Sequence, residues 1–120
     1  MDFSVADIQT LVQAYRECAA AHGRASFGGD YKTANWNADL IAEIYRELRR
    51  RGVEAQAFIL PLLNDDDPSV RVWTATHALD FAPDKGEPVL MELSKIGKGA
   101  CRLDAEMTLI EWKNGRLKFP

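Results

Sequence analysis

The sequence has few of the residues that metal sites and disulfide frameworks require. Its 120 residues include two cysteines, Cys18 and Cys101, and two histidines, His22 and His77. A closed zinc site takes about four ligands, and no second pair of ligands accompanies Cys18 and His22. Two cysteines in predicted helices give no disulfide framework, so we expect half-buried thiols in a reducing compartment. The sequence therefore predicts no metal and no cofactor.

The sequence also lacks a long apolar run and an excess of positive charge. No segment approaches the ~20 apolar residues of a membrane span, and residues 1–4 do not resemble the start of a signal peptide. We therefore expect a cytoplasmic protein with no membrane partner. The formal net charge is −3. Because a general nucleic-acid-binding domain is normally basic, we expect no nucleic-acid partner.

No segment has the alternating pattern of a strand, and apolar residues recur at helical spacing throughout. A first helix is indicated by residues spaced three or four apart, namely Val5, Ile8, Val12, Tyr15 and Ala19. We expect Ser4 and Asp7 to form a capping box and Gly23 to end this helix. A second helix, capped by Asp30, is indicated by Ala34, Ala38, Ile41, Tyr45 and Leu48.

Four more helices follow in the expected organisation. The third covers about 54–63, with Pro61 inside it, where a proline usually kinks a helix. The fourth covers about 68–82, with Asp67 as its N-cap and Pro68 at its first position. The fifth and sixth cover about 85–96 and 100–112.

The fourth and sixth predicted helices align as an internal repeat. Arg71 aligns with Arg102 and Phe81 with Trp112, both at an offset of 31 residues. A period of this length with helix–turn–helix content is typical of stacked helical repeats, which share a continuous core. The sequence therefore predicts an all-α protein, a short α-α superhelix of about three antiparallel helix pairs in one domain, 1–120.

These residues also carry a resemblance. The turn and helix start Asp66-Asp67-Pro68-Ser69-Val70-Arg71 resembles HEAT-like repeats. More specifically, the chain resembles a small family of bacterial proteins that is known only as a domain of unknown function. The residues that match are 29–32, Asn35, 45–48, Gly52, 62–63, 67–71, 76–79, 105–106, Leu109, Trp112 and Gly115. The resemblance implies an α-α superhelix and no established activity.

One pattern suggests a binding surface for a protein partner. Trp73 and His77 are separated by one helical turn, and their repeat equivalents are Asp104 and Thr108. Such a pair can line the concave face of a helical stack, where partners commonly bind, and tryptophan is frequent among binding hot spots. With Glu111, we predict a surface of Trp73, His77, Thr108 and Glu111. The alternative is that Trp73 and His77 pack against neighbouring helices.

Arg71 and Arg102 begin equivalent helices, so a repeated structural role is expected for them. Each guanidinium would pair with an aspartate of a turn, Asp65 or Asp67 being candidates, because a guanidinium suits a carboxylate partner. We predict a structural ladder of Asp65, Asp67, Arg71 and Arg102. Anion binding by the two arginines is the alternative.

Three further patterns are interpreted as structural. The run 65–67 lacks the alternating ligands, glycine and distant glutamate of a calcium loop. The segment 23–33 places Lys-Thr too late for a phosphate-binding loop and follows a helix instead of a strand. The cations of 46–51 lack interleaved aromatic residues and suit a solvated helix face.

The sequence thus favours a non-enzymatic protein-interaction module that uses a helical-repeat surface to bind an unidentified protein. A homodimer stays open, since self-association can cover an exposed apolar face of a terminal helix pair. The alternative is a small-ligand-binding protein or an enzyme with a pocket between helix pairs, which would require a concave pocket that holds convergent titratable groups with shifted pKa values.

Overall fold

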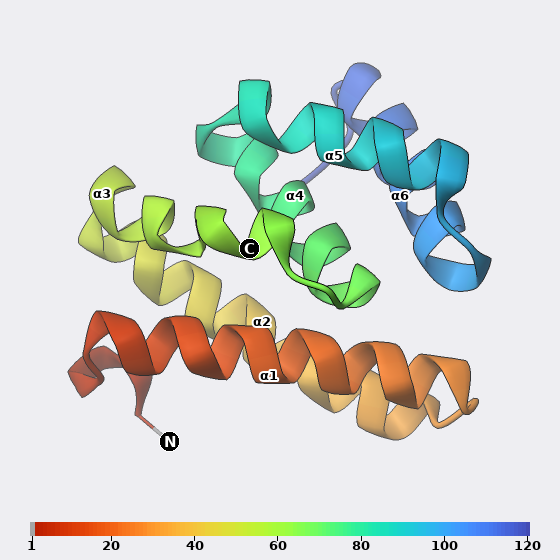
Figure 1. Ribbon diagram of the computed structural model, residues 1–120. Helices are drawn as coiled ribbons and strands as arrows, with labels where there is room; N and C mark the ends of the chain where they lie inside the picture. The colour runs from red at the N-terminus through yellow and green to blue at the C-terminus, as the bar shows by residue number, and fades with distance from the viewer. Residues whose placement is uncertain (1) are drawn as a thin grey trace. The chain divides into compact units, whose positions relative to one another are not determined.

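The computed structural model describes residues 2–120, and every regular element in that range is helical (Figure 1). The helices are the 3-10 helix η1 (Phe3–Val5), α1 (Ile8–Phe27), α2 (Tyr31–Arg51), α3 (Val53–Gln56), the 3-10 helix η2 (Ala57–Asn64), α4 (Pro68–Phe81), α5 (Pro83–Ile96) and α6 (Gly99–Lys113). The predicted all-α fold of packed helix pairs is confirmed.

The contacts divide the chain into two compact units. The first unit ends at Pro61 and also takes in Pro120, and the second is Leu62–Phe119. The prediction of a single domain over 1–120 stays a prediction, and each unit is described by itself.

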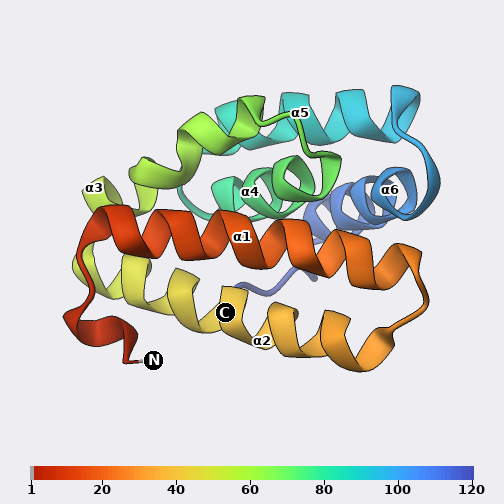
Figure 2. The same ribbon diagram turned by 60° about the horizontal axis from the view of Figure 1, so that its bottom comes forward.

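In the first unit, α1 and α2 lie side by side (Figure 2). Six of the residues predicted for the two apolar faces are buried, namely Tyr15, Ala19, Ala34, Ile41, Tyr45 and Leu48. Leu11 is also buried, although it is not among the predicted residues, whereas the predicted Val5 lies in η1 and is 82% exposed. The side chain of Gln56 donates a hydrogen bond of 2.9 Å to the buried Tyr45 hydroxyl, which ties α3 to α2.

The start and end of α1 differ from the prediction. Asp7 accepts a hydrogen bond from the Thr10 backbone N–H at 2.8 Å and is the N-cap, whereas Ser4 lies in η1. The helix continues through Gly23 to Phe27. A glycine inside a helix costs only about 1 kcal/mol relative to alanine. The chain reverses instead at Gly29, whose φ of 76° is the left-handed conformation that ends many helices.

The prediction of one α-helix over 54–63 is wrong after Gln56, where the chain forms a 3-10 helix instead. The α-helix is short, and η2 carries the chain on to Asn64 in 3-10 geometry. Pro61 lies inside this segment and has no N–H to donate to the carbonyl four residues earlier, which disfavours a continuous α-helix there.

In the second unit, α4 packs against α5 and α6, and α5 packs against α6. Its core is a cluster of Val72, Ala75, Leu79, Leu90, Leu93, Ala105 and Leu109. Asp67 is the N-cap of α4, as predicted, and accepts a hydrogen bond from the Ser69 backbone N–H at 2.8 Å. Helix α5 begins at Pro83, two residues before its predicted start. A proline suits this first position because an N–H there has no partner within the helix.

Candidate protein-interaction surface

Helix α6 has two apolar faces, and its inner face belongs to the core of the second unit. Ala105 is fully buried and Leu109 is nearly so, and both belong to the cluster formed with α4 and α5. Trp112, one turn beyond, is partly buried against the same cluster. This face therefore fixes how α6 is rotated about its axis.

The opposite face of α6 is also apolar but is exposed. Leu103 is 58% exposed, Met107 51% and Ile110 49%. Their spacing of four and three residues places them on one line along the helix. We call these three residues the α6 stripe. A row of large apolar side chains on an exposed helix face is typical of a surface that another molecule covers.

Charged residues flank the α6 stripe on both sides. At 100° per residue, Asp104 and Glu111 lie on one side, whereas Arg102, Glu106 and Lys113 lie on the other. Arg102 and Glu106 form an ion pair of 3.2 Å, and Arg116 donates to both carboxylate oxygens of Glu111 at 3.2 Å. The stripe thus has an apolar centre and a charged rim, as protein interfaces commonly do.

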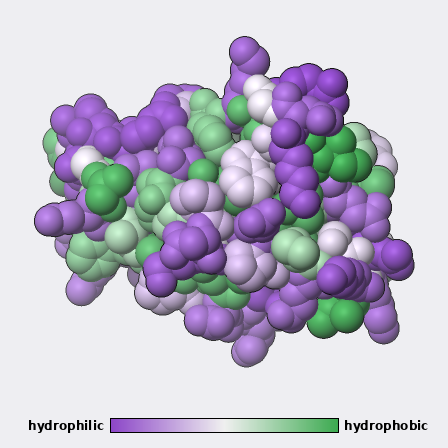
Figure 3. Space-filling model, turned by 90° about the horizontal axis from the view of Figure 1, so that it is seen from above, coloured by the Kyte–Doolittle hydropathy of each residue, from purple (hydrophilic) through white to green (hydrophobic). Residues whose placement is uncertain are grey.

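Outside α6, other large apolar side chains of the described residues are also exposed, namely Val5, Phe27, Tyr31, Trp36, Val53, Phe58, Met91 and Ile96. Phe27 at the end of α1 is 95% exposed and Trp36 on α2 is 67% exposed. Figure 3 shows one face of the molecule, on which hydrophobic patches are separated by hydrophilic residues. Singly exposed apolar residues are normal on protein surfaces, so the alignment of three on one helix is what distinguishes the α6 stripe.

The residues predicted for the partner surface are only partly exposed. The rings of Trp73 and His77 lie 6.0 Å apart between centroids and are tilted by 49°. His77 is 2% exposed and Trp73 is half-buried, so the structure keeps the imidazole away from solvent. Thr108 and Glu111 are half-buried on α6, on the acidic side of the stripe. Two of the four predicted residues thus lie beside the α6 stripe, and the prediction of a partner surface stays a prediction.

The predicted ladder residues make local contacts. Asp65 accepts a hydrogen bond from the Asp67 backbone N–H at 2.9 Å, and Asp67 caps α4. Arg102 pairs with Glu106 of its own helix, in place of the turn aspartate that the sequence suggested. Arg71 and Asp65 line a pocket of about 330 Å³. The Nε atom of Arg71 is buried and has no hydrogen-bond partner among the residues that the structure describes.

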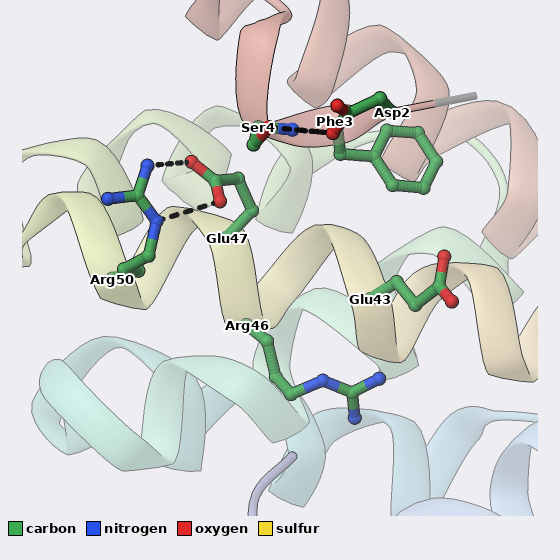
Figure 4. A pocket seen from close by; sticks show the side chains of 7 residues that line it. All are labelled: Asp2, Phe3, Ser4, Glu43, Arg46, Glu47 and Arg50. Atoms are coloured by element: carbon green, nitrogen blue, oxygen red, sulfur yellow. Dashed lines mark hydrogen bonds and ion pairs between the residues drawn. The ribbon is translucent and has the colours of Figure 1, made fainter.

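The basic residues at the end of α2 are used largely within the first unit. Glu47 and Arg50 point toward one another, and Arg46 extends away from them (Figure 4). The Glu47 carboxylate accepts from Arg50 at 2.6 and 2.9 Å and from Arg51 at 2.6 Å, which lowers its pKa from 4.5 to about 2. Arg51 also donates to the Phe3, Ser4 and Ala6 carbonyls and so holds η1 against α2.

The two thiols lie in environments that disfavour the thiolate. Burial raises the pKa of both Cys18 and Cys101, and the nearby carboxylates of Glu17 and Asp104 raise them further. Within residues 2–120, no cluster of three or more histidine, cysteine or acidic side chains is placed to hold a metal ion. None of the helices described has the length and apolar content needed to cross a membrane.

The comparisons with known proteins add support for the fold. No family model matches the chain, and no curated protein matches its sequence. The fold is similar to the crystal structure of the protein RPA1889 from Rhodopseudomonas palustris CGA009, with a TM-score of 0.92 and 24% sequence identity over 100% of this chain and 99% of that chain. At this identity the likeness shows the fold alone.

Proposed function

We propose that the chain is a non-enzymatic protein-interaction module of the cytoplasm and that the α6 stripe is the centre of its binding surface. The observation that carries the proposal is the row of Leu103, Met107 and Ile110, each about half exposed on a helix whose other face is packed. Thr108 and Glu111 lie beside the stripe and belong to its rim. The free state of both cysteines fits a reducing compartment.

The character of the pockets favours this function over small-ligand binding. Ligand pockets are mostly apolar with a few convergent polar groups. The pocket beside η1 and the pocket beside Asp65 each have about 330 Å³ and are lined mainly by charged residues. A third pocket, of about 380 Å³, lies on α2, and Trp36 is the one large apolar residue among the five that line it. Similarly, the use of Arg50 and Arg51 inside the first unit favours a structural role for the basic segment over nucleic-acid binding.

The resemblance to HEAT-like repeats forms part of the proposal. Residues separated by 31 positions are buried in both α4 and α6, namely Thr74 with Ala105 and Ala78 with Leu109. Other equivalent positions differ, because Val72, Ala75 and Leu79 are buried whereas Leu103, Glu106 and Ile110 are not.

The experiment is an affinity capture from the native host with the tagged chain and two charge variants. Met107→Glu places a carboxylate in the middle of the stripe, and Phe27→Glu places the same carboxylate at an exposed apolar position of the first unit. Circular dichroism and thermal unfolding check that both variants are folded. A protein bound by the wild type and Phe27→Glu but lost from Met107→Glu supports the proposal. Equal capture by all three proteins, or no specific capture, contradicts it.

A further inference from the structure

The two sides of the α6 stripe differ in charge. One side has the carboxylates of Asp104 and Glu111, with the guanidinium of Arg116 paired to Glu111, and we call it the acidic flank. The other side has the cations of Arg102 and Lys113 with the single carboxylate of Glu106, and we call it the basic flank. The surface is therefore an apolar line between opposite charges, a pattern that is complementary to itself in one orientation.

The orientation follows from symmetry. Suppose that two copies pack stripe to stripe about a two-fold axis perpendicular to α6. Their α6 helices are then antiparallel, and each flank faces the same flank of the other copy. In this arrangement like charges meet. If the two-fold axis is parallel to α6, the helices are parallel and the acidic flank of each copy faces the basic flank of the other.

On this basis we propose that the occupant of the α6 stripe is a second copy of the chain, packed with its α6 parallel to the first. The inference rests on the proposed function and names its partner. Lys113 of each copy then lies about two residues along the helix from the other copy's Glu111, and Arg102 lies the same distance from the other copy's Asp104. Each contact occurs twice because the interface is symmetric.

The size of the surface sets the strength of the dimer. Helix α6 has 15 residues, so it is about 22 Å long and roughly 10–12 Å across. One such face is smaller than the ~800 Å² per partner of a stable interface. We therefore expect a weak dimer whose population rises with concentration. The ion pairs Arg102–Glu106 and Arg116–Glu111 within each copy compete with the contacts between copies, which weakens the dimer further.

Sedimentation velocity of the purified full chain over a hundredfold range of concentration, up to about 1 mM, tests the inference. We expect the wild type and Phe27→Glu to shift from monomer toward dimer, and Met107→Glu to remain a monomer. A wild type that stays monomeric at the highest concentration overturns the inference. If its affinity capture still returns another protein that Met107→Glu loses, the proposed function survives and only the identity of the partner is wrong.

Reversal of one flank charge tests the parallel orientation. In the parallel dimer, Lys113→Glu places a new carboxylate near Glu111 of the other copy, so like charges meet at two symmetric positions. We expect the dissociation constant to rise about threefold to tenfold. Combination with Glu111→Lys should return it toward the wild-type value. A tighter dimer of Lys113→Glu overturns the orientation, because in the antiparallel arrangement the new carboxylate faces Arg102. A dissociation constant unchanged by Lys113→Glu also overturns it.

Discussion

Gly86 of α5 lies directly over the backbone of Ala75 in α4. A β-carbon added at Gly86 would be 2.5 Å from the Ala75 carbonyl oxygen and 3.0 Å from the β-carbon of Ala78. The two helices can approach this closely only because Gly86 has no side chain. This contact sets the distance between α4 and α5, against which the inner face of α6 then packs.

We expect Gly86→Ala to destabilise the chain by about 1–3 kcal/mol, the usual cost of forcing extra volume into a packed core. This loss is the net change, because the clash with α4 should outweigh the gain of about 1 kcal/mol in helix propensity when alanine replaces glycine. Urea unfolding measures it. Gly28→Ala is the matched control, since its β-carbon would meet nothing nearer than 3.6 Å and its φ is −81°. Equal stability of the two variants would show that the helices separate freely.

Asp67 caps α4 through the Ser69 backbone N–H. We expect Asp67→Ala to lower the free energy of unfolding by about 1 kcal/mol, because it leaves that donor without its side-chain acceptor. The neighbouring Asp66→Ala is the control, since Asp66 is exposed and does not cap the helix. Its expected change is within about 0.5 kcal/mol. A loss at Asp66 as large as at Asp67 would contradict the assignment of the cap.

The sequence predicts the starts of α2 and α4 well because their signals are local. Asp30 and Asp67 cap the helices expected of them, and the spacing of Tyr15, Ala19 and Ile41 correctly indicates the core. The end of α1 and the geometry around Pro61 were predicted less well. Whether α1 continues past Gly23 depends on whether its packing outweighs the free-energy cost of a glycine inside a helix. In the same way, the helix type around Pro61 depends on how packing compensates for the missing N–H, and a local sequence pattern carries no information about packing.

The α6 stripe could not be separated from a core face by sequence alone. Ala105 and Leu109 on one face, and Leu103 and Met107 on the other, both have helical spacing. Periodicity shows that a face is apolar but not which of two faces a neighbouring helix covers. The spacing of Trp73 and His77 likewise shows that they share one helix face but not whether that face is exposed. The burial of His77 depends on how the neighbouring helices pack, which the spacing does not specify.

The Glu47 carboxylate makes stability depend on pH. Its pKa is about 2 in the folded chain, because Arg50 and Arg51 donate hydrogen bonds to it, and its usual value is 4.5. Between these values the unfolded state binds more protons, so the contribution of Glu47 is complete above pH 4.5 and is lost as the pH falls toward 2.

We therefore expect Glu47→Gln to lower the melting temperature by a few degrees at neutral pH and by less near pH 2. Thermal unfolding of both proteins across this range measures the difference. The carboxyls of Asp7 and Asp30, whose pKa values are also lowered by hydrogen bonds, are present in both proteins and largely cancel. Hydrogen bonds from Ser4 lower the pKa of Asp2 and the charge of Glu47 raises it slightly, so removal of that charge changes the contribution of Asp2 by a smaller amount. A difference that is constant with pH would refute the role of the two arginines.

The thiols of Cys18 and Cys101 should react slowly. Burial raises the pKa of both, so less thiolate is present at a given pH than in a free cysteine. We expect the native chain to react with a disulfide reagent at pH 8 at least about tenfold more slowly than the urea-unfolded chain. Equal rates in the two states would show that the thiols are open to solvent and unperturbed.

Photo-crosslinking in living host cells tests the central claim most directly. A photoreactive amino acid is introduced at Met107 in the α6 stripe and, in a separate protein, at the exposed Phe27. Our account predicts discrete protein adducts from position 107, either a dimer of the chain or a complex with another protein, and few or none from position 27. The absence of adducts at position 107, or an identical pattern at both positions, would contradict it.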